Sequence, residues 1–180
     1  GLNPDSQQGD KVILDILKRC GGKFKPVEGG LHFDRSLLKA TEIDLADCPD
    51  LGPILFTLGC FCSGETVIRN AGRLRLKESD RIEAMQTELR KMGARIEVDG
   101  DTVHIQGVAL HAPNAPLSGH NDHRIVMALA VAAIASGLPA LLCGAEAVDK
   151  SWPAFWSVLR GLGAKVELNT DKQEEFDIKA

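Results

Sequence analysis

One local pattern recurs along the chain and constrains its fold more than any other feature. An amphipathic helix is followed by a glycine and then by an alternating strand in three segments, ILDILKRCGGKFKPVEGGLHF, AMQTELRKMGARIEVDGDTVHI and FWSVLRGLGAKVEL. The glycines that separate helix from strand are Gly21, Gly93 and Gly163, about 70 residues apart. A recurrence at this spacing indicates a repeated supersecondary unit. The first two segments continue through Gly29-Gly30 and Asp99-Gly100 into a second strand, as β-hairpins do.

Two further segments lie between these repeats, and their helical parts are apolar almost throughout. They read PDLGPILFTLGCFCSGETVIRN and NDHRIVMALAVAAIASGLPALLCG. Each predicts a helix, a Ser-Gly pair and a short strand, Thr66–Ile68 in the first and Ala140–Leu142 in the second. The longest apolar run, Ile125–Ala135, is shorter than the roughly 20 residues that span a bilayer. Because a helix that is hydrophobic on every side must be buried on every side, both helices are predicted to form the core.

The complete pattern is a β-α-β-α-β-β unit that is repeated, with its first copy truncated at Gly1. The fold class is therefore α/β, with helices inside and sheets outside. A chain of 180 residues with 44% hydrophobic content fits one domain, residues 1–180, with its own core. Because the chain starts at Gly1 without an initiator methionine, we expect it to be a piece of a longer protein.

Charge and cysteine content exclude several classes of function. A net charge of −4 and a pI near 5.7 indicate neither a nucleic-acid nor a membrane surface, although a local basic pocket for an anionic substrate remains compatible with them. The five cysteines show no paired framework, and with no secretion signal they favour a reducing cytoplasm. Cys60 and Cys62 lie in an apolar run, which favours buried packing over a metal site.

The charged residues that suggest chemistry are concentrated in RLRLKESDRIEAMQTELRKMG, residues 73–93. Its second half predicts an amphipathic helix that Ser79 or Asp80 caps and Gly93 ends. The apolar face of this helix comprises Ile82, Met85, Leu89 and Met92. Its first half places cations and the Glu78 carboxylate at the helix N-terminus, where free N–H groups favour anions. The alternative is a solvated helix start held by ion pairs three or four residues apart.

Three more positions precede predicted helices in the same way. Asp50 comes before the first apolar helix, Asn121-Asp122-His123-Arg124 opens the second, and Lys150 precedes the helix of the last repeat. Capping explains an Asp, Asn or His at such a place, and a lone Lys is ordinarily solvated. Arg124 differs, because a guanidinium at the mouth of a buried helix needs an anion. The aromatic residues after Lys150, which are Trp152, Phe155 and Trp156, are predicted to lie in the core. If the helices run parallel, their N-termini converge on one face.

The motifs KESDR and NDHR, in this order, resemble the signature sequences of the EPSP synthase family, the 3-phosphoshikimate 1-carboxyvinyltransferases. The resemblance covers nearly the whole chain. It implies the inverse α/β, barrel-like fold of the enolpyruvyl transferases, with buried parallel helices. It also implies a reaction: the enolpyruvyl group of phosphoenolpyruvate moves to the 5-hydroxyl of shikimate 3-phosphate, and phosphate leaves. This is a step of aromatic amino acid biosynthesis, and neither a metal nor an organic cofactor is implied.

The resemblance also implies roles for individual residues. Asp50 would contact the shikimate ring hydroxyls and take the proton from the attacking 5-hydroxyl. Lys77 would lie between the two substrates, and Glu78 would protonate the phosphoenolpyruvate methylene. The residues implied in substrate binding are Arg81 and Arg124 for the phosphoenolpyruvate carboxylate, Lys150 for its phosphate, and Arg73 for the shikimate phosphate. Many relatives carry Asn at the position of Arg73.

Full-length members of the family have two such domains, and both contribute to the active site. The resemblance therefore implies that this chain is one domain and an inactive half-site, whose missing partner is the N-terminal domain of the same protein. The whole protein would be a monomer in the cytoplasm. Two alternatives stay open. A UDP-N-acetylglucosamine enolpyruvyl transferase shares the fold but lacks KESDR and NDHR, and a non-catalytic binding domain could use the same scaffold.

Overall fold

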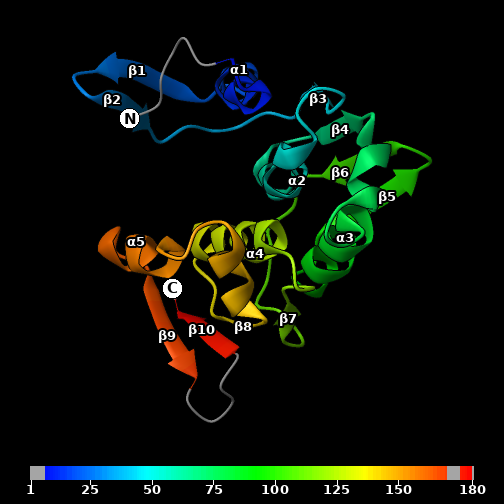
Figure 1. Cartoon of the computed structure of the whole chain (residues 1–180). Helices are drawn as coiled ribbons and strands as arrows, with labels where there is room; N and C mark the ends of the chain where they lie inside the picture. Colours follow the sequence, from blue (N-terminus) through cyan, green and yellow to red (C-terminus); the bar gives the residue numbers. More distant parts are fainter. Residues whose placement is uncertain (1–6, 170–174, 180) are drawn as a thin grey trace.

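The structure is a computed structural model that describes residues 7–169 and 175–179. Figure 1 shows its helices and strands in chain order. The helices are α1 (Ile13–Arg19), α2 (Gly52–Phe61), α3 (Arg81–Lys91), α4 (His123–Ser136) and α5 (Phe155–Gly161). The strands are β1 (Lys23–Val27), β2 (Gly30–Asp34), β3 (Glu42–Asp44), β4 (Glu65–Arg69), β5 (Arg95–Asp99), β6 (Thr102–Gln106), β7 (Leu117–Ser118), β8 (Ala140–Cys143), β9 (Lys165–Asn169) and β10 (Glu175–Lys179). Short 3-10 turns are η1 (Gly9–Val12), η2 (Pro49–Leu51), η3 (Ala71–Leu76) and η4 (Ala145–Lys150).

Two copies of the predicted β-α-β-α-β-β unit are present in full. The first runs from β3 through α2, β4 and α3 to the β5–β6 hairpin, and the second runs from β7 through α4, β8 and α5 to β9 and β10. Their sheets have matching orders, β3-β4-β6-β5 and β7-β8-β10-β9. In each sheet the first two strands are parallel and the other neighbours antiparallel. A parallel pair needs a long crossover, and the apolar helices α2 and α4 supply it.

From residue 7 onward, the amino-terminal part that the structure describes contains the last three elements of such a unit, α1 and the β1–β2 hairpin. The predicted helix–glycine–strand junctions are confirmed in all three places. Gly21, Gly93 and Gly163 have φ angles of +86°, +87° and +97° just after α1, α3 and α5. Glycine adopts this left-handed conformation without the steric cost of a Cβ, which is why it ends these helices.

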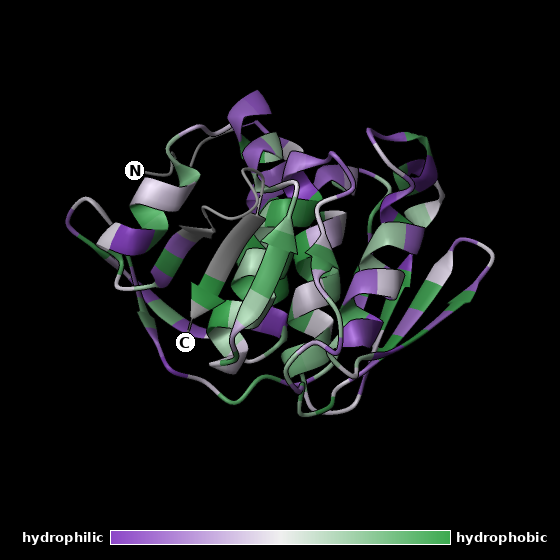
Figure 2. Ribbon diagram, turned by 90° about the horizontal axis from the view of Figure 1, so that it is seen from below, coloured by the Kyte–Doolittle hydropathy of each residue, from purple (hydrophilic) through white to green (hydrophobic). Residues whose placement is uncertain are grey.

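The helices α2 and α4 lie at the centre of the molecule, between the two four-stranded sheets (Figure 1). Most residues of both helices are buried, as predicted for segments with no polar side. The two helices are joined by a buried hydrogen bond in which Thr57 Oγ1 donates to Ala128 O over 3.1 Å. Figure 2 shows the hydrophobic colouring concentrated in the middle of the molecule. Among the described residues, no helix combines the length and the apolar character that crossing a membrane requires.

One prediction about the core is wrong. Phe155 and Trp156 are buried, but Trp152 is 45% exposed and only packs edge-on against Phe155, with ring centroids 5.5 Å apart. The helical spacing that places all three on one face requires the helix to include Trp152. In the structure α5 begins at Phe155, so Trp152 lies in the turn before it.

The cysteines behave as small hydrophobic residues. The thiols of residues 20, 48, 60 and 62 are buried, and Cys143 is partly exposed; none forms a disulfide. Burial raises the pKa of both Cys60 and Cys62 to about 12, so these thiols stay protonated at neutral pH. Because the thiolate is the form that binds metals, the buried packing predicted for this pair agrees with its chemistry.

Candidate functional site

The residues predicted to precede four helices meet on one face of the molecule. Arg81 at the start of α3 and Arg124 at the start of α4 both contact Asp50, which lies in η2 just before α2, at 3.2 and 3.0 Å. Lys150, the last residue of η4, lies 3.5 Å from Glu78, which precedes α3. The structure thus brings together segments that are up to 100 positions apart in the chain, from Asp50 to Lys150. We call these residues, with Lys77, Asp122 and His123, the charged cluster.

Asp50 is the centre of the charged cluster. Its Oδ1 lies 3.0 Å from Lys77 Nζ, its Oδ2 accepts from Arg124 Nη2, and its backbone oxygen accepts from Arg124 Nη1. Partial burial alone would raise the pKa of this carboxyl. The hydrogen bond from Lys77 and the charges of Arg124 and Arg81 outweigh burial, and the pKa is lowered. Capping does not explain this residue, because the N-cap of α2 is Leu51.

Arg81 and Asp122 form a buried ion pair beneath Asp50. The guanidinium makes two hydrogen bonds to the carboxylate, from Nε to Oδ2 at 2.8 Å and from Nη2 to Oδ1 at 3.1 Å. The two residues are 2% and 0% exposed. Asp122 also accepts from Ser79 Oγ and from the backbone N–H of Arg124, and the latter bond caps α4. Burial alone would raise the pKa of the Asp122 carboxyl. The hydrogen bonds and the charge of Arg81 lower the pKa by more than burial raises it, so the net shift is downward.

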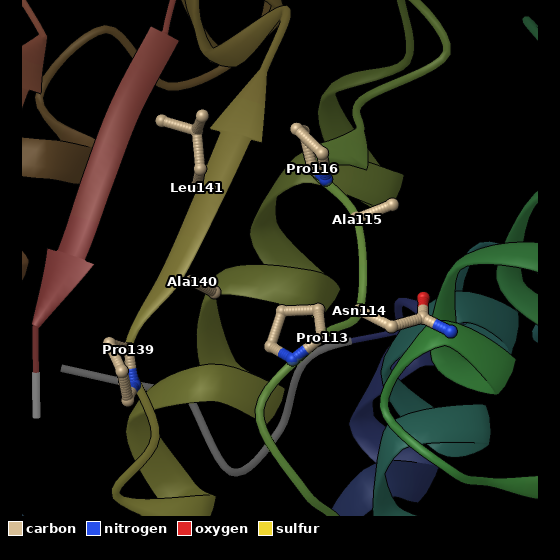
Figure 3. A pocket seen from close by; sticks show the side chains of 7 residues that line it. All are labelled: Pro113, Asn114, Ala115, Pro116, Pro139, Ala140 and Leu141. Carbon is tan, nitrogen blue, oxygen red and sulfur yellow. The ribbon is translucent and has the colours of Figure 1, made fainter.

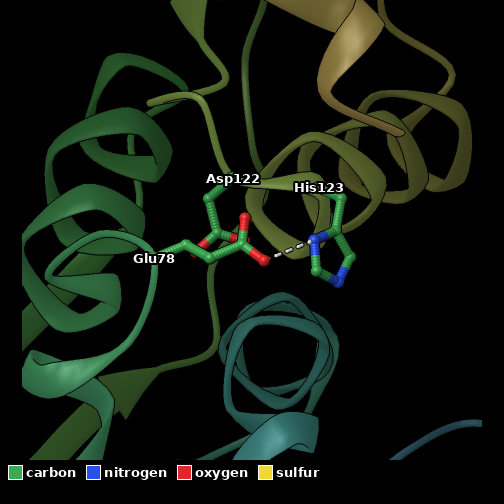
Figure 4. A group of neighbouring side chains, drawn as sticks. All are labelled: Glu78, Asp122 and His123. Atoms are coloured by element: carbon green, nitrogen blue, oxygen red, sulfur yellow. Dashed lines mark ion pairs between the residues drawn. The ribbon is translucent and has the colours of Figure 1, made fainter. Parts of the chain in front are cut away.

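Glu78 faces His123, as Figure 4 shows. It also lies beside Lys150. His123 Nδ1 lies 3.1 Å from Glu78 Oε1, but the two groups are not aligned as a hydrogen bond, and Nδ1 has no hydrogen-bond partner among the described residues. The ligand atoms of Glu78, Asp122 and His123 lie within 4.8 Å of one another. This trio is a poor cation site, because Asp122 is already bonded to Arg81 and an ammonium lies beside Glu78.

Of the two remaining predicted residues, Lys150 belongs to the charged cluster and Arg73 does not. Lys150 Nζ also donates to the backbone oxygen of Asn121, so it bridges the loop before α4 and the loop before α3. Arg73, which the resemblance associates with a phosphate, is exposed and donates to Ala46 O over 3.2 Å. Within the described residues, its polar contact is therefore outside the charged cluster.

Sequence reasoning gave Asp122 and His123 only capping and orienting roles. Asp122 does cap α4, but it is also the counter-ion of Arg81, and His123 faces Glu78. One signal in the sequence pointed to the ion pair. Asp122 stands at the mouth of the all-apolar helix α4, where it is fully buried, and a buried carboxylate requires a cation. Asp80, by contrast, caps α3 as predicted, with Oδ1 accepting from the N–H groups of Ile82 and Glu83.

Two cavities of the structure lie away from the charged cluster. One, of about 290 Å³, is formed by the loop before β7 and by the start of β8 (Figure 3). Its lining is Pro113, Asn114, Ala115, Pro116, Pro139, Ala140 and Leu141, which offers one polar side chain and no titratable group. The other, of about 430 Å³, lies between α1 and the β1–β2 hairpin. Neither cavity is lined by a residue of the charged cluster. The candidate site is therefore identified by its charged side chains and not by a cavity.

The cluster combines anion binding with a group that can transfer a proton. It holds four cations, at positions 77, 81, 124 and 150, against three carboxylates, at positions 50, 78 and 122. The N-termini of α3 and α4 add the partial positive charge of their free N–H groups. Preorganised donors of this kind stabilise negative charge that develops during a reaction. The arrangement therefore suits phosphorylated or carboxylated ligands.

Comparisons with known proteins agree with this chemistry. The sequence profile of EPSP synthase (3-phosphoshikimate 1-carboxyvinyltransferase) matches residues 1–159. A 3-phosphoshikimate 1-carboxyvinyltransferase from Clostridium acetobutylicum is 45% identical over 92% of the chain. Those from Brachyspira hyodysenteriae and Methanocaldococcus jannaschii are 43% and 40% identical over 92% and 93% of it.

A solved structure of EPSP synthase from Acinetobacter baumannii is also similar. It superposes with a TM-score of 0.71 and 27% sequence identity over 89% of the chain. The chain spans 38% of the length of the C. acetobutylicum relative and 40% of the A. baumannii structure. The similarity therefore covers nearly all of this chain but well under half of each relative.

Proposed function

The chain belongs to the EPSP synthase family, and from this premise we propose that it supplies one domain of a 3-phosphoshikimate 1-carboxyvinyltransferase. The longer protein transfers the enolpyruvyl group of phosphoenolpyruvate to the 5-hydroxyl of shikimate 3-phosphate and releases phosphate. The observation that carries this proposal is the convergence of Asp50, Glu78, Arg124 and Lys150 at adjoining helix N-termini. Both substrates are anionic, and this face is rich in cations.

The chemistry proceeds by addition and then elimination. The oxygen of the 5-hydroxyl attacks C2 of phosphoenolpyruvate and loses its proton to a base, while C3 gains a proton from an acid. The C–O bond to phosphate then breaks, and loss of a proton from C3 restores the double bond. Glu78 is the proposed acid for the first step, because its carboxyl lies beside Lys150 and Lys150 is the proposed phosphate ligand.

Asp50 is the proposed base, and we propose that its neighbours control its basicity. Three cations contact it in the structure, and the lowered pKa that results makes it a weaker base. A phosphorylated or carboxylated substrate competes for Lys77 and Arg124. We propose that substrate binding draws these cations away and so raises the basicity of Asp50 at the moment when the reaction needs it.

Arg124 is the better placed of the two guanidinium groups to bind the phosphoenolpyruvate carboxylate. Its side chain is 30% exposed, whereas that of Arg81 is 3% exposed and uses two of its nitrogens on Asp122. Arg81 then contributes through Nη1, which points toward Asp50. We propose that Lys77, whose Nζ lies 3.0 Å from Asp50 Oδ1, would lie between the two substrates. Arg73 would need to leave Ala46 to reach the shikimate phosphate.

We also propose that the rest of the site comes from another domain of the same protein. The chain spans 38% of its C. acetobutylicum relative. Partly exposed apolar residues form a stripe on each central helix, at positions 54, 58 and 61 of α2 and at positions 127, 131 and 134 of α4. A further segment covering these stripes would bury them. Without it, orientation of the substrates is lost, and the isolated chain should show no turnover.

Two assays test the proposed function on the longer protein. The first measures phosphate release from phosphoenolpyruvate in the presence of shikimate 3-phosphate, with and without added EDTA, and we expect turnover in both. The second measures the thermal midpoint with shikimate 3-phosphate and with UDP-N-acetylglucosamine, and only the former should raise it. A rise with UDP-N-acetylglucosamine alone would assign the related enolpyruvyl transferase reaction instead. Stabilisation by neither compound, together with no turnover, would favour a non-catalytic domain. Gel filtration tests the predicted monomer, and the cytoplasmic location stays a prediction.

A further inference from the structure

A buried carboxylate on α3 lies outside the charged cluster, and the proposed chemistry does not use it. Glu88 is 1% exposed, although a glutamate is rarely buried unless it is paired. It follows Arg81 by seven residues, which is about two helical turns, so the two side chains lie on the same face of α3. Arg81 contacts Asp122. Glu88 contacts Ser118 and His120, which come just before Asp122 in the chain.

The Glu88 carboxylate makes three polar contacts. Its Oε2 accepts from the backbone N–H of Ser118 at 2.8 Å and from Lys91 Nζ at 2.7 Å. Its Oε1 lies 2.9 Å from the ring nitrogen Nε2 of His120. Lys91 extends this arrangement, because its ammonium also donates to Pro116 O over 2.9 Å. Four residues of the segment 116–122 are thereby held to α3, two by Glu88, one by Lys91 and one by Arg81.

The backbone between these fixed points has an unfavourable conformation. His120 and Asn121 have φ angles of +50° and +52°, in the left-handed region that residues with a Cβ seldom adopt. Such a conformation is energetically unfavourable for these residues and persists only where their surroundings impose it. This turn comes directly before Asp122, His123 and Arg124, and the backbone oxygen of Asn121 accepts from Lys150.

We propose that Glu88 is a positioning residue for the site. It holds His120 and Ser118 so that the left-handed turn aims Asp122 at Arg81 and Arg124 at Asp50. Its effect on substrate binding rests on the function proposed above, whereas its effect on the turn does not. The competing explanation is that Glu88 only neutralises Lys91 inside the fold, in which case the turn keeps its order without it.

Deuterium exchange of backbone amides tests the hold on the turn in the longer protein, whatever its activity. Glu88→Ala removes the contacts that Glu88 makes with Ser118 and His120, and we expect amides in residues 117–124 to exchange at least about tenfold faster, while other peptides are unchanged. Glu88→Gln should restore protection, because its amide oxygen can still accept from Ser118 and its NH₂ can donate to His120. The matched control is Glu83→Ala, which removes an exposed glutamate from the same helix. Unchanged protection in a folded Glu88→Ala protein would overturn the proposal.

A second variant keeps the test decisive if Glu88→Ala does not fold. His120→Asn retains a residue type that tolerates positive φ but is too short to reach Glu88 as the imidazole does. It too should accelerate exchange in residues 117–124 while leaving the thermal midpoint nearly unchanged. Normal protection in this variant, together with failure of Glu88→Ala to fold, would assign Glu88 to stability alone.

Kinetics then test whether the hold matters for the reaction. Glu88→Ala should raise KM for phosphoenolpyruvate by about tenfold with a smaller change in kcat, and Glu88→Gln should recover most of this loss. In an Arg124→Lys background the same substitution should have little further effect, because both changes disturb the same group. An equal effect in both backgrounds would contradict positioning through Arg124. If the parent protein has no turnover, the proposed function fails, and the exchange data still decide whether Glu88 holds the turn.

Discussion

The two complete units share one backbone plan but differ in what their outer helices carry. In each, a left-handed residue after the second strand, Asn70 or Gly144, leads into a 3-10 turn and then into a helix. In the first unit that helix is α3, which starts at Arg81 and buries a guanidinium and a carboxylate. In the second unit it is α5, which starts at Phe155 and buries two aromatic rings.

This difference teaches which part of the sequence sets the fold and which part sets the chemistry. The apolar helices, the glycine junctions and the hairpins are common to both units, and they determine the backbone path. The residues at the start of the outer helix are free to vary on that path. In the second unit the aromatic ring of Trp156 anchors the helix, with its Nε1 donating to Ala145 O, and only Lys150 extends from this unit's outer-helix region to the cluster.

The largest expected effect comes from breaking the buried ion pair that distinguishes α3. Arg81→Ala leaves Asp122 buried without its guanidinium, and we expect a loss of about 3–5 kcal/mol in the free energy of unfolding. Arg69→Ala is the matched control, because Arg69 forms an exposed pair with Glu42 at 2.7 Å. Exposed pairs contribute about 0–1 kcal/mol, so the control should be nearly neutral. Urea unfolding of both variants measures the difference. Equal losses in the free energy of unfolding would show that the buried Arg81–Asp122 pair stabilises the fold no more than the exposed pair does.

The next effect concerns Glu78, the carboxylate of the first unit that is the proposed proton donor. Glu78→Gln keeps the size and hydrogen-bonding reach of the side chain but removes its ionisable proton. If Glu78 is the acid, kcat falls by about 10² or more with a modest change in KM. Steady-state phosphate release by the longer protein measures this, with Glu83→Gln as an exposed control on α3. Turnover at the parental rate would remove Glu78 from the role and leave Asp50 or a residue of the other domain as donor.

A smaller effect is expected at the helix that belongs to the second unit. Arg124→Lys keeps the charge but loses the planar fork that binds a carboxylate through two nitrogens. KM for phosphoenolpyruvate should rise by about tenfold, and binding of shikimate 3-phosphate should hardly change. Titration of each substrate separately distinguishes the outcomes. Equal weakening of both would mean that Arg124 supports Asp50 and does not bind the carboxylate.

The smallest effect is the pH dependence of stability. Asp50 and Asp122 have lower pKa values in the folded chain than in the unfolded one. A carboxyl whose pKa is lowered by folding contributes its full stabilising free energy above the unfolded pKa of about 3.9. That contribution is lost as the pH falls through the folded pKa. The free energy of unfolding should therefore be insensitive to these groups between pH 7 and about 5 and should fall below pH about 4. Asp122→Asn should flatten this decline, and an unchanged pH profile in that variant would contradict the ion-pair assignment.

The sequence predicted the fold well because its signals are local and periodic. The three glycine junctions, the two apolar helices and the hairpins each follow from residues adjacent in the chain. Trp152 was placed wrongly because the start of α5 is set by packing that spacing alone does not reveal. Arg124 was found because its charge conflicts with a buried neighbourhood, whereas the roles of Asp50, Glu78 and Lys150 followed only from the resemblance to the EPSP synthase family.

The pairings within the site could not be predicted in the same way. Arg81 and Asp122 are 41 positions apart, and Glu88 and His120 are 32 apart, so no local pattern links them. The left-handed turn at His120 and Asn121 also gives no signal in the sequence, because neither residue is glycine. Such contacts depend on how α3 and α4 pack, which is a property of the assembled core.

The central claim is that the two units, despite their different outer helices, serve one active site. Glu78 belongs to the first unit and Lys150 to the second, and their side chains lie 3.5 Å apart. The most direct test is a double-mutant cycle of Glu78→Gln and Lys150→Met, measured as kcat/KM for phosphoenolpyruvate in the longer protein. We predict a coupling of about 1 kcal/mol or more, with the double variant losing less than the product of the single losses. If the free-energy losses of the two single variants add up to that of the double variant within about 0.5 kcal/mol, the residues act independently, and a shared site is contradicted.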